Sequence, residues 1–353
     1  MLLWTISPPW RMVRHRIVAK GAFCQRFKSV NLATVSTALS NQSSGPVPFS
    51  PCFVGVDVGP MVIRTEVYSG TFDLLGKMKL SAKPERGLAS IVERIERCVR
   101  YAADECDVSL ANIDAIGVGL PGVVNASGQV TLDHGFGLRN VRLGQEIEAR
   151  LGRPVHVGNI FELACHAIQV LESSHDSGDF GVLFPGAILA AGLVLNGKPV
   201  DLSRFPPEDP LLPPDAGNVV KWTDDPRFRG FRARDFRKAI RKGGEHALLF
   251  LRQSVGEAAV FGARLVQNAG VRQLVLGGGA IDENKAEMVA AAKSVLAAAL
   301  ARQDKVDPDL IKITTSELGD NAGMTGAALM AAQSTLLKEQ SDGPLMGHLV
   351  LAR

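Results

Sequence analysis

The chain has 353 residues, of which 46% are hydrophobic and 21% are charged, and its formal net charge is +3. This length predicts about two domains, and so small a net charge excludes a strong overall attraction to nucleic acid or membrane. Five scattered cysteines, an odd number at irregular spacing, argue against a disulfide framework and a zinc knuckle.

Residues 1–51 are predicted to be a basic leader followed by a linker. No Asp or Glu precedes Asp57, whereas Arg and Lys recur through the leader. Three interpretations stay open: a disordered segment, an organelle-targeting peptide, which is typically basic and poor in acid, or a partial DNA-binding arm whose recognition helix would be 32–41. Residues 42–51 have the Ser, Pro and Gly content of a flexible linker.

Residues 52–157 are predicted to form a first α/β lobe. Apolar residues recur at helical spacing after Pro84, whereas 53–57 is an apolar run that ends at Asp57 and is typical of a buried strand. The predicted strands are 53–57, 62–68, 73–80, 113–118 and 154–157, and the predicted helices are 84–106 and 143–151.

Residues 158–317 are predicted to form a second α/β lobe, followed by a helix and a disordered tail at 338–353. The predicted strands are 180–184, 187–195, 273–276 and 311–314, and the predicted helices are 162–172, 245–269, 282–302 and 322–337. Residues 221–242 are rich in arginine and are predicted to be a solvated insertion. Two similar lobes imply a cleft between them, where small ligands tend to bind.

Six segments, taken in order, resemble the ROK family of sugar kinases and sugar-responsive repressors. They are VGVDVGPMVIRT (54–65), IGVGLPGVVN (116–125), VHVGNIFELA (155–164), residues 186–198, VLGGGAI (275–281) and LGDNAGMTGAA (318–328). The resemblance covers 53 to about 337. It implies an α/β, two-lobed actin-like ATPase (ribonuclease H-like) fold with an interlobe cleft, in which 318–337 returns to the first lobe.

The position of the family's catalytic base is occupied by Ile160. In the family an aspartate follows the asparagine that corresponds to Asn159, and it accepts the proton of the attacking sugar hydroxyl, a contribution of roughly 10²–10⁴ in rate. Isoleucine accepts no proton, so no intact catalytic residue is predicted. The candidate substitutes are Asp133 and His134 in a neighbouring loop and Glu162, which would point about 200° away around the helix.

The resemblance also implies a nucleotide and phosphate site with altered chemistry. Its implied residues are Asp57, Gly59, Gly186, Gly277, Gly278 and Gly279. However, Pro60 lacks a backbone donor, Met61 lacks the hydroxyl of the family's threonine, and Ile188 replaces a glycine of the second phosphate turn. We therefore expect no more than residual binding of ATP and Mg²⁺.

The implied sugar site is also altered. Its implied residues are Gly119, Pro121, Gly122, Asn159 and Asn218. Asn218 and Lys221 stand where the family has a sugar-binding glutamate and a zinc-binding histidine, and a charged lysine offers a metal no lone pair. The family's cysteine run is missing from 221–242. We therefore predict no zinc or other metal ligand.

Three functions stay open. The first is a sugar-kinase-like protein with lost or weakened phosphotransfer that acts as a sugar- or metabolite-binding regulatory module. The others are an active, glucokinase-like hexose kinase with a replaced base, and a ROK-type transcriptional regulator. The resemblance implies a homodimer with a small sugar as ligand. We expect a cytoplasmic protein, unless the leader targets an organelle, with no membrane or nucleic-acid partner.

Overall fold

The structure is a computed structural model. It describes residues 51–125, 127–133, 136–172, 178–185, 189–200, 202, 226, 238–301 and 306–342, with the backbone alone at 132–133 and 338–342. The predictions for the leader (1–50), for His134, Gly186, Asn218 and Lys221 and for the tail beyond 342 lie outside this part of the chain, as does the side chain of Asp133.

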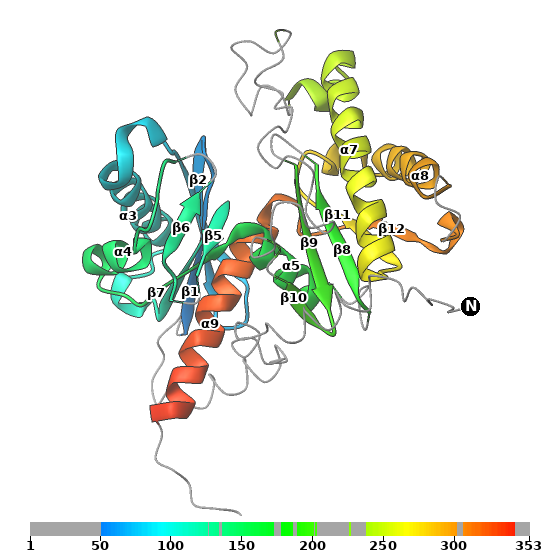
Figure 1. The fold of residues 1–353 in the computed structure, drawn as a ribbon. Helices are drawn as coiled ribbons and strands as arrows, with labels where there is room; N and C mark the ends of the chain where they lie inside the picture. The colour runs from blue at the N-terminus through cyan, green and yellow to red at the C-terminus, as the bar shows by residue number, and fades with distance from the viewer. Residues whose placement is uncertain are drawn as a thin grey trace, which may run out of the picture.

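The first sheet has five strands in the order β3-β2-β1-β4-β7. They are β1 (Cys52–Val58), β2 (Val62–Ser69), β3 (Leu74–Ser81), β4 (Ala115–Leu120) and β7 (Val155–Asn159). Every residue of β1 and β4 is buried, as expected for apolar strands covered on both faces. Helices α3 (Gly87–Glu105) and α4 (Leu143–Leu151) cover the outer face (Figure 1).

The second sheet also has five strands, in the order β10-β9-β8-β11-β12. They are β8 (Phe180–Phe184), β9 (Ala190–Leu195), β10 (Lys198–Val200), β11 (Gln273–Leu276) and β12 (Lys312–Thr315). Helices α7 (Glu245–Ala269) and α8 (Lys285–Ala301) pack on its outer face (Figure 1). Each sheet has its own apolar core against its outer helices.

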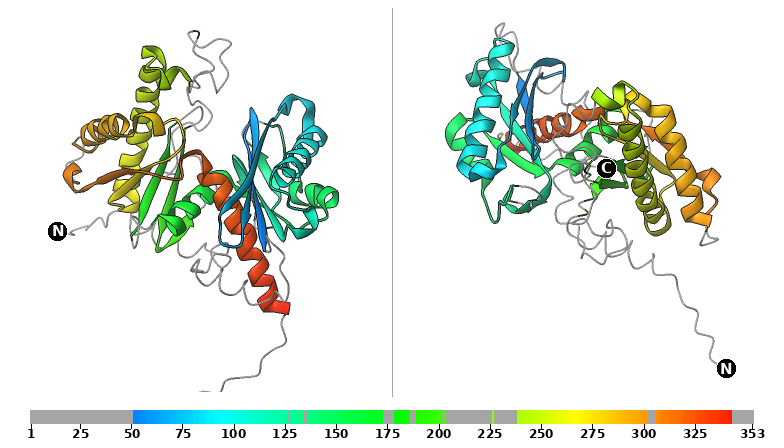
Figure 2. Two further views of the ribbon diagram at one scale, coloured as in Figure 1. Left: turned by 180° about the vertical axis from the view of Figure 1, so that it is seen from behind. Right: turned by 90° about the horizontal axis from the view of Figure 1, so that it is seen from above.

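Helices α5 (Ile160–Leu171) and α9 (Ala322–Asp342) lie between the two sheets (Figures 1 and 2). Glycines allow α9 to approach its neighbours at backbone distance. A Cβ atom added to Gly117 of β4 would lie 1.8 Å from the carbonyl oxygen of Ala327, and one added to Gly326 would lie 1.9 Å from that of Leu163. The central helix pair is therefore held rigidly against the first sheet.

The remaining elements are short. A two-stranded ribbon, β5 (Gly122–Val124) and β6 (Val130–Asp133), follows β4. The 3₁₀ turns are η2 (Pro84–Arg86), η3 (Leu110–Asn112), η8 (Asp282–Asn284), η9 (Pro308–Leu310) and η10 (Gly319–Asn321). Among the described residues, no helix has the length and apolarity that a membrane crossing requires.

Most predicted elements are confirmed within a few residues, and two boundaries were wrong. The predicted helix 84–106 is a 3₁₀ turn followed by α3, because Gly87, at the junction of the two, takes a positive φ of 76°. Helix α9 continues past Leu337 to Asp342, so the predicted disordered tail began too early. The residues after Leu337 contain no helix breaker until Gly343 and Pro344.

Candidate functional site

The candidate site lies where β1, β4 and β7 end and helix α5 begins. Parallel pairing places Asp57 of β1 beside Gly119 of β4, and Leu120 of β4 beside Asn159 of β7. Carboxyl ends of neighbouring parallel strands are where open α/β sheets bind ligands. The fold thus gathers Asp57, Gly119 and Asn159 at one edge, as the motif resemblance implies.

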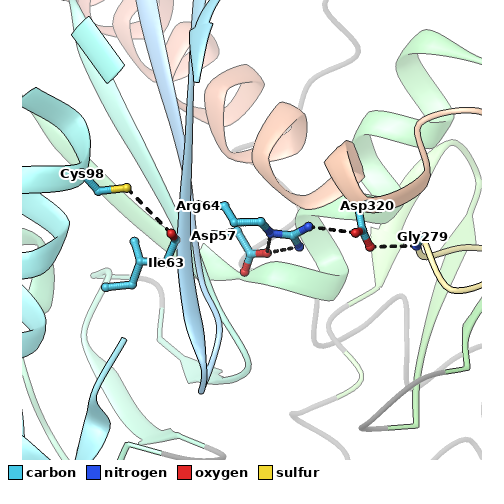
Figure 3. A network of polar contacts seen from close by, with 6 residues as sticks. All are labelled: Asp57, Ile63, Arg64, Cys98, Gly279 and Asp320. Atoms are coloured by element: carbon cyan, nitrogen blue, oxygen red, sulfur yellow. Dashed lines mark hydrogen bonds and ion pairs between the residues drawn. The ribbon is translucent and has the colours of Figure 1, made fainter. Parts of the chain in front are cut away.

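An arginine that the sequence analysis did not single out fills the space beside Asp57. Arg64 of β2 donates to Oδ2 of Asp57 through Nη2 at 2.5 Å and through Nε at 3.1 Å. Its Nη1 also pairs with Oδ2 of Asp320 at 3.2 Å. Figure 3 shows the guanidinium lying between the two carboxylates.

Asp320 extends this network to the second lobe. It lies in η10, immediately before α9, and its Oδ1 accepts a hydrogen bond from the backbone N–H of Gly279 at 2.8 Å. Gly279 follows strand β11 of the second sheet. Asp320 therefore caps the glycine turn of the other lobe (Figure 3).

Burial sets the electrostatics of this network. Desolvation raises the pKa of the Asp57 carboxyl, although the adjacent Arg64 opposes the rise. Desolvation also acts to lower the pKa of Arg64, but Asp57 and Asp320 outweigh it and hold that pKa above its usual value. The guanidinium therefore remains charged, and its charge is balanced mainly inside the protein.

The first hairpin offers a phosphate few donors. The N–H of Gly59 is engaged within the turn by the carbonyl of Val62 at 3.0 Å, and Pro60 has no N–H. Met61 is exposed and carries no hydroxyl. A metal carboxylate must also be free to accept a hydrated Mg²⁺, and Asp57 is held by Arg64. These residues do not fit a Mg²⁺-phosphate group as they are arranged.

The three glycines after β11 are engaged in contacts within the protein. The Gly277 N–H donates to the carbonyl of Leu183 at 2.8 Å. Gly278 has a φ of 95°, which a side chain rarely adopts, and a Cβ atom on Gly279 would lie 2.4 Å from Cγ of Asp320. This local packing accounts for all three glycines. Whether an adenosine also binds there stays a prediction.

Ile160 begins α5, and its side chain is buried between β4 and α9. A Cβ atom on Gly119 would lie 2.4 Å from Cδ1 of Ile160, and a Cβ atom on Gly323 would lie 2.5 Å from the same atom. Ile160 is 8% exposed. The position that the resemblance assigns to the base thus carries an apolar side chain packed between β4 and α9.

Asn159 has a structural role at the start of α5. Its Oδ1 accepts from the N–H groups of Phe161 at 2.9 Å and Glu162 at 3.1 Å, which is the usual bonding of an N-cap. Its Nδ2 donates to the carbonyl of Gly122 at 2.8 Å. Pro121 and Gly122 are buried beside it. The predicted sugar-binding roles of these residues stay predictions.

Glu162, one predicted substitute for the base, lies in the first turn of α5 and is partly buried. Its charge contributes to the raised pKa of Cys165, one turn further along the helix. Helix α5 packs there on β9 and β10 of the second sheet. Within the described ranges, no group of three or more His, Cys, Asp or Glu side chains is arranged to hold a metal ion.

Arg64 could have been noticed in the sequence. It lies in the strand VIRTEVYS, where alternate residues Arg64, Glu66 and Tyr68 must share one face. A charged residue in a strand beside a buried strand needs a partner. Asp57 lies directly opposite Arg64 in the hairpin, whereas its second partner, Asp320, could not be predicted because it is distant in sequence.

Two lobes built on five-stranded sheets, with a central helix pair between them and a polar site at their junction, define a protein of the actin-like ATPase fold. The chain belongs to the ROK family: the family model matches residues 53–201 and 218–334. A comparison with curated proteins found no match.

Solved structures agree with this fold. A ROK family glucokinase from Streptomyces griseus, in complex with glucose and AMPPNP, has a TM-score of 0.63 and 20% identity, covering 80% of this chain and 99% of its own. A ROK hexokinase from Thermus thermophilus has a TM-score of 0.55 and 23% identity, covering 83% and 100%. A ROK family transcriptional regulator, a homologue of E. coli MLC, has a TM-score of 0.61 and 20% identity, covering 83% and 81%.

Proposed function

We propose that this protein is a ROK sugar-kinase-like protein with lost or strongly weakened ATP-dependent phosphotransfer. It acts as a regulatory module that binds a sugar or related metabolite. The observation that carries the proposal is Ile160, which is packed against Gly119 and Gly323 at the position that the family resemblance assigns to the base. A sugar hydroxyl bound nearby has no carboxylate at that position to take its proton.

The engaged Asp57 supports the same proposal. A kinase of this type needs a carboxylate free to hold Mg²⁺ and backbone donors around the phosphates. Here Asp57 pairs with Arg64, and the hairpin after it has Pro60 in place of a donor. Two requirements of phosphotransfer, a proton acceptor and a metal site, therefore both differ from the family pattern.

A coupled assay of ATP consumption across common hexoses and aminosugars tests the proposal. We expect turnover far below about 1 s⁻¹, the lower end of ordinary enzymatic rates. Thermal shift with the same sugars, in the absence of nucleotide, tests ligand binding separately, because a ligand that binds only the folded state raises the melting temperature. Turnover above that rate would establish the alternative, an active hexose kinase with a replaced base.

Ile160→Asp, with Ile160→Asn as its matched control, tests whether the base is the only missing part of the catalytic site. Both variants place a polar group of similar size between β4 and α9, but only aspartate can accept a proton. Activity in Ile160→Asp alone would mean that the remaining site is competent. We expect no activity in either variant, because Asp57 stays paired with Arg64.

The similarity to a ROK transcriptional regulator supports a second candidate function. This candidate places a DNA-binding segment within residues 1–50. It predicts salt-sensitive binding to duplex DNA that disappears when those residues are deleted. We also propose a homodimer, as the family resemblance implies, which sedimentation analysis would test.

A further inference from the structure

We propose that Arg64 is a built-in cation that takes the place of a metal ion at Asp57 and fastens the two lobes together through Asp320. This inference goes beyond the proposed function, because it assigns Asp57 an internal cation whatever ligand the protein binds. It follows from the position of the Arg64 guanidinium. Arg64 lies on β2 and pairs with carboxylates on two other elements, Asp57 of β1 and Asp320 of η10.

The first step is the pairing with Asp57. Two N–H groups of one guanidinium, at 2.5 and 3.1 Å, converge on a single carboxylate oxygen. The side chains of Asp57 and Arg64 are only 12% and 28% exposed, so water screens their attraction weakly. A divalent cation that approached this carboxylate would have to displace the guanidinium or share the oxygen with it.

The second step is the position of Asp320. Its Oδ2 pairs with Arg64 of the first sheet, while its Oδ1 holds the Gly279 N–H at the end of β11 in the second sheet. One carboxylate thus joins the two lobes at the mouth of the site (Figure 3). Without the guanidinium, Asp57 and Asp320 would be two like charges near each other, and the charge of Asp320 already acts to raise the pKa of Asp57 and that of Asp282.

The third step is the support that β2 gives to Arg64. Glu66 and Tyr68 follow it on the same face of β2. The Tyr68 hydroxyl donates to the buried Glu66 carboxylate and lies 2.9 Å from Oγ1 of Thr325 in α9. The same strand face therefore contacts η10 through Arg64 and α9 through Tyr68. These two contacts fix the position of β2 relative to η10 and α9, and so hold the Arg64 side chain beside Asp57.

Mn²⁺ binding tests whether Arg64 occupies a metal position. The free ion gives an electron paramagnetic resonance signal that is lost on binding, so the metal alone serves as the probe. We expect the intact wild-type chain to bind Mn²⁺ weakly, and Arg64→Gln to bind one Mn²⁺ at least about tenfold more tightly. Arg64→Gln retains an apolar stem and an amide donor but has no charge.

Two further variants make the result specific. Arg97→Gln removes an exposed arginine of α3 that pairs with Glu93, and it should leave Mn²⁺ affinity unchanged. Arg64→Gln combined with Asp57→Asn should lose the gained site. A wild-type chain that already binds Mn²⁺ as tightly as Arg64→Gln, or a gained site that survives Asp57→Asn, would overturn the proposal.

Asp320→Asn tests the connection between the lobes. Asparagine keeps an oxygen for the Gly279 N–H but loses the charge that pairs with Arg64. We expect faster hydrogen exchange in η10 and the first turn of α9, to a similar extent in Asp320→Asn, in Arg64→Gln and in the double variant, because each breaks the same pair. Independent, additive effects of the two substitutions, or unchanged exchange in both, would show that the pair does not fasten the lobes.

Discussion

The side chain of Ile160 lies directly over the bare backbone of Gly119, so that any side chain on Gly119 would meet it. An added Cβ atom would lie 2.4 Å from Cδ1 of Ile160 and 3.3 Å from its Cα. Ile160, which the resemblance places at the position of the base, is thus part of the apolar contact between β4 and α5.

This contact predicts a compensating pair of substitutions. Gly119→Ala should lower the free energy of unfolding by about 1–3 kcal/mol through overpacking, and Ile160→Ala should lower it by about 2–5 kcal/mol through an unfilled cavity. The double variant should lose less than the sum, since the new methyl group occupies part of the vacated space. Urea denaturation measures all three, and additive losses would contradict the contact.

The close approach of α9 to α5 predicts a much larger effect at Gly326. An added methyl group would lie 1.9 Å from the carbonyl oxygen of Leu163, and a backbone atom cannot rotate away as a side chain can. Gly326→Ala should therefore cost more than about 4 kcal/mol, an exceptional loss for one methyl group, or prevent folding.

Gly256 provides the matched control for that substitution. It lies within α7, and its added Cβ atom would meet only Cγ2 of Val295, at an ordinary 3.6 Å. Gly256→Ala should stabilise the protein by up to about 1 kcal/mol, because alanine is the better helix former. Thermal denaturation compares the two, and similar losses at both positions would contradict the packing of α9.

The start of α5 predicts separable effects at Asn159. Asn159→Ala removes both the helix cap and the bond to Gly122, and should cost about 0.5–2 kcal/mol for the cap alone. Asn159→Asp keeps an oxygen for the cap but cannot donate to Gly122. We therefore expect its loss, measured by urea denaturation, to be the smaller one. An equal loss in both variants would place the stability in the Gly122 bond.

Much of the fold could be predicted from the sequence because it depends on local patterns. The apolar runs of β1 and β8 and the helical spacing in α3 are each visible within a few residues. The site depended in part on a partner distant in sequence. Asp57 was identified from its hairpin, and Arg64 lies directly opposite it on β2, but the reach of Arg64 to Asp320 depends on how β2 and η10 come together.

Ile160 also shows how far local sequence patterns can predict a site. The sequence indicated that no proton acceptor stands at this position, because isoleucine has none. It could not indicate where the side chain points, since that depends on the absence of side chains at Gly119 and Gly323 on two other elements. The chemistry of one residue is visible locally, whereas its surroundings are fixed by the tertiary structure.

The buried pair of His166 in α5 and Gln333 in α9 predicts that the free energy of unfolding falls at acid pH. Nε2 of His166 lies 2.9 Å from Nε2 and 3.2 Å from Oε1 of Gln333. Burial lowers the pKa of His166 from 6.5 to about 4, outweighing the hydrogen bond to Gln333. Between these values the unfolded chain binds a proton that the folded chain does not, so stability falls as the pH drops from about 6.5 to about 4.

The expected loss over that pH range is about 3 kcal/mol from this residue. His166→Gln keeps a polar partner for Gln333 but cannot titrate, so its stability should change less over the same range. His246→Gln, at an exposed position of α7, is the matched control and should keep the wild-type slope. Urea denaturation at several pH values measures the slopes, and a wild-type slope in His166→Gln would show that another group carries the acid sensitivity.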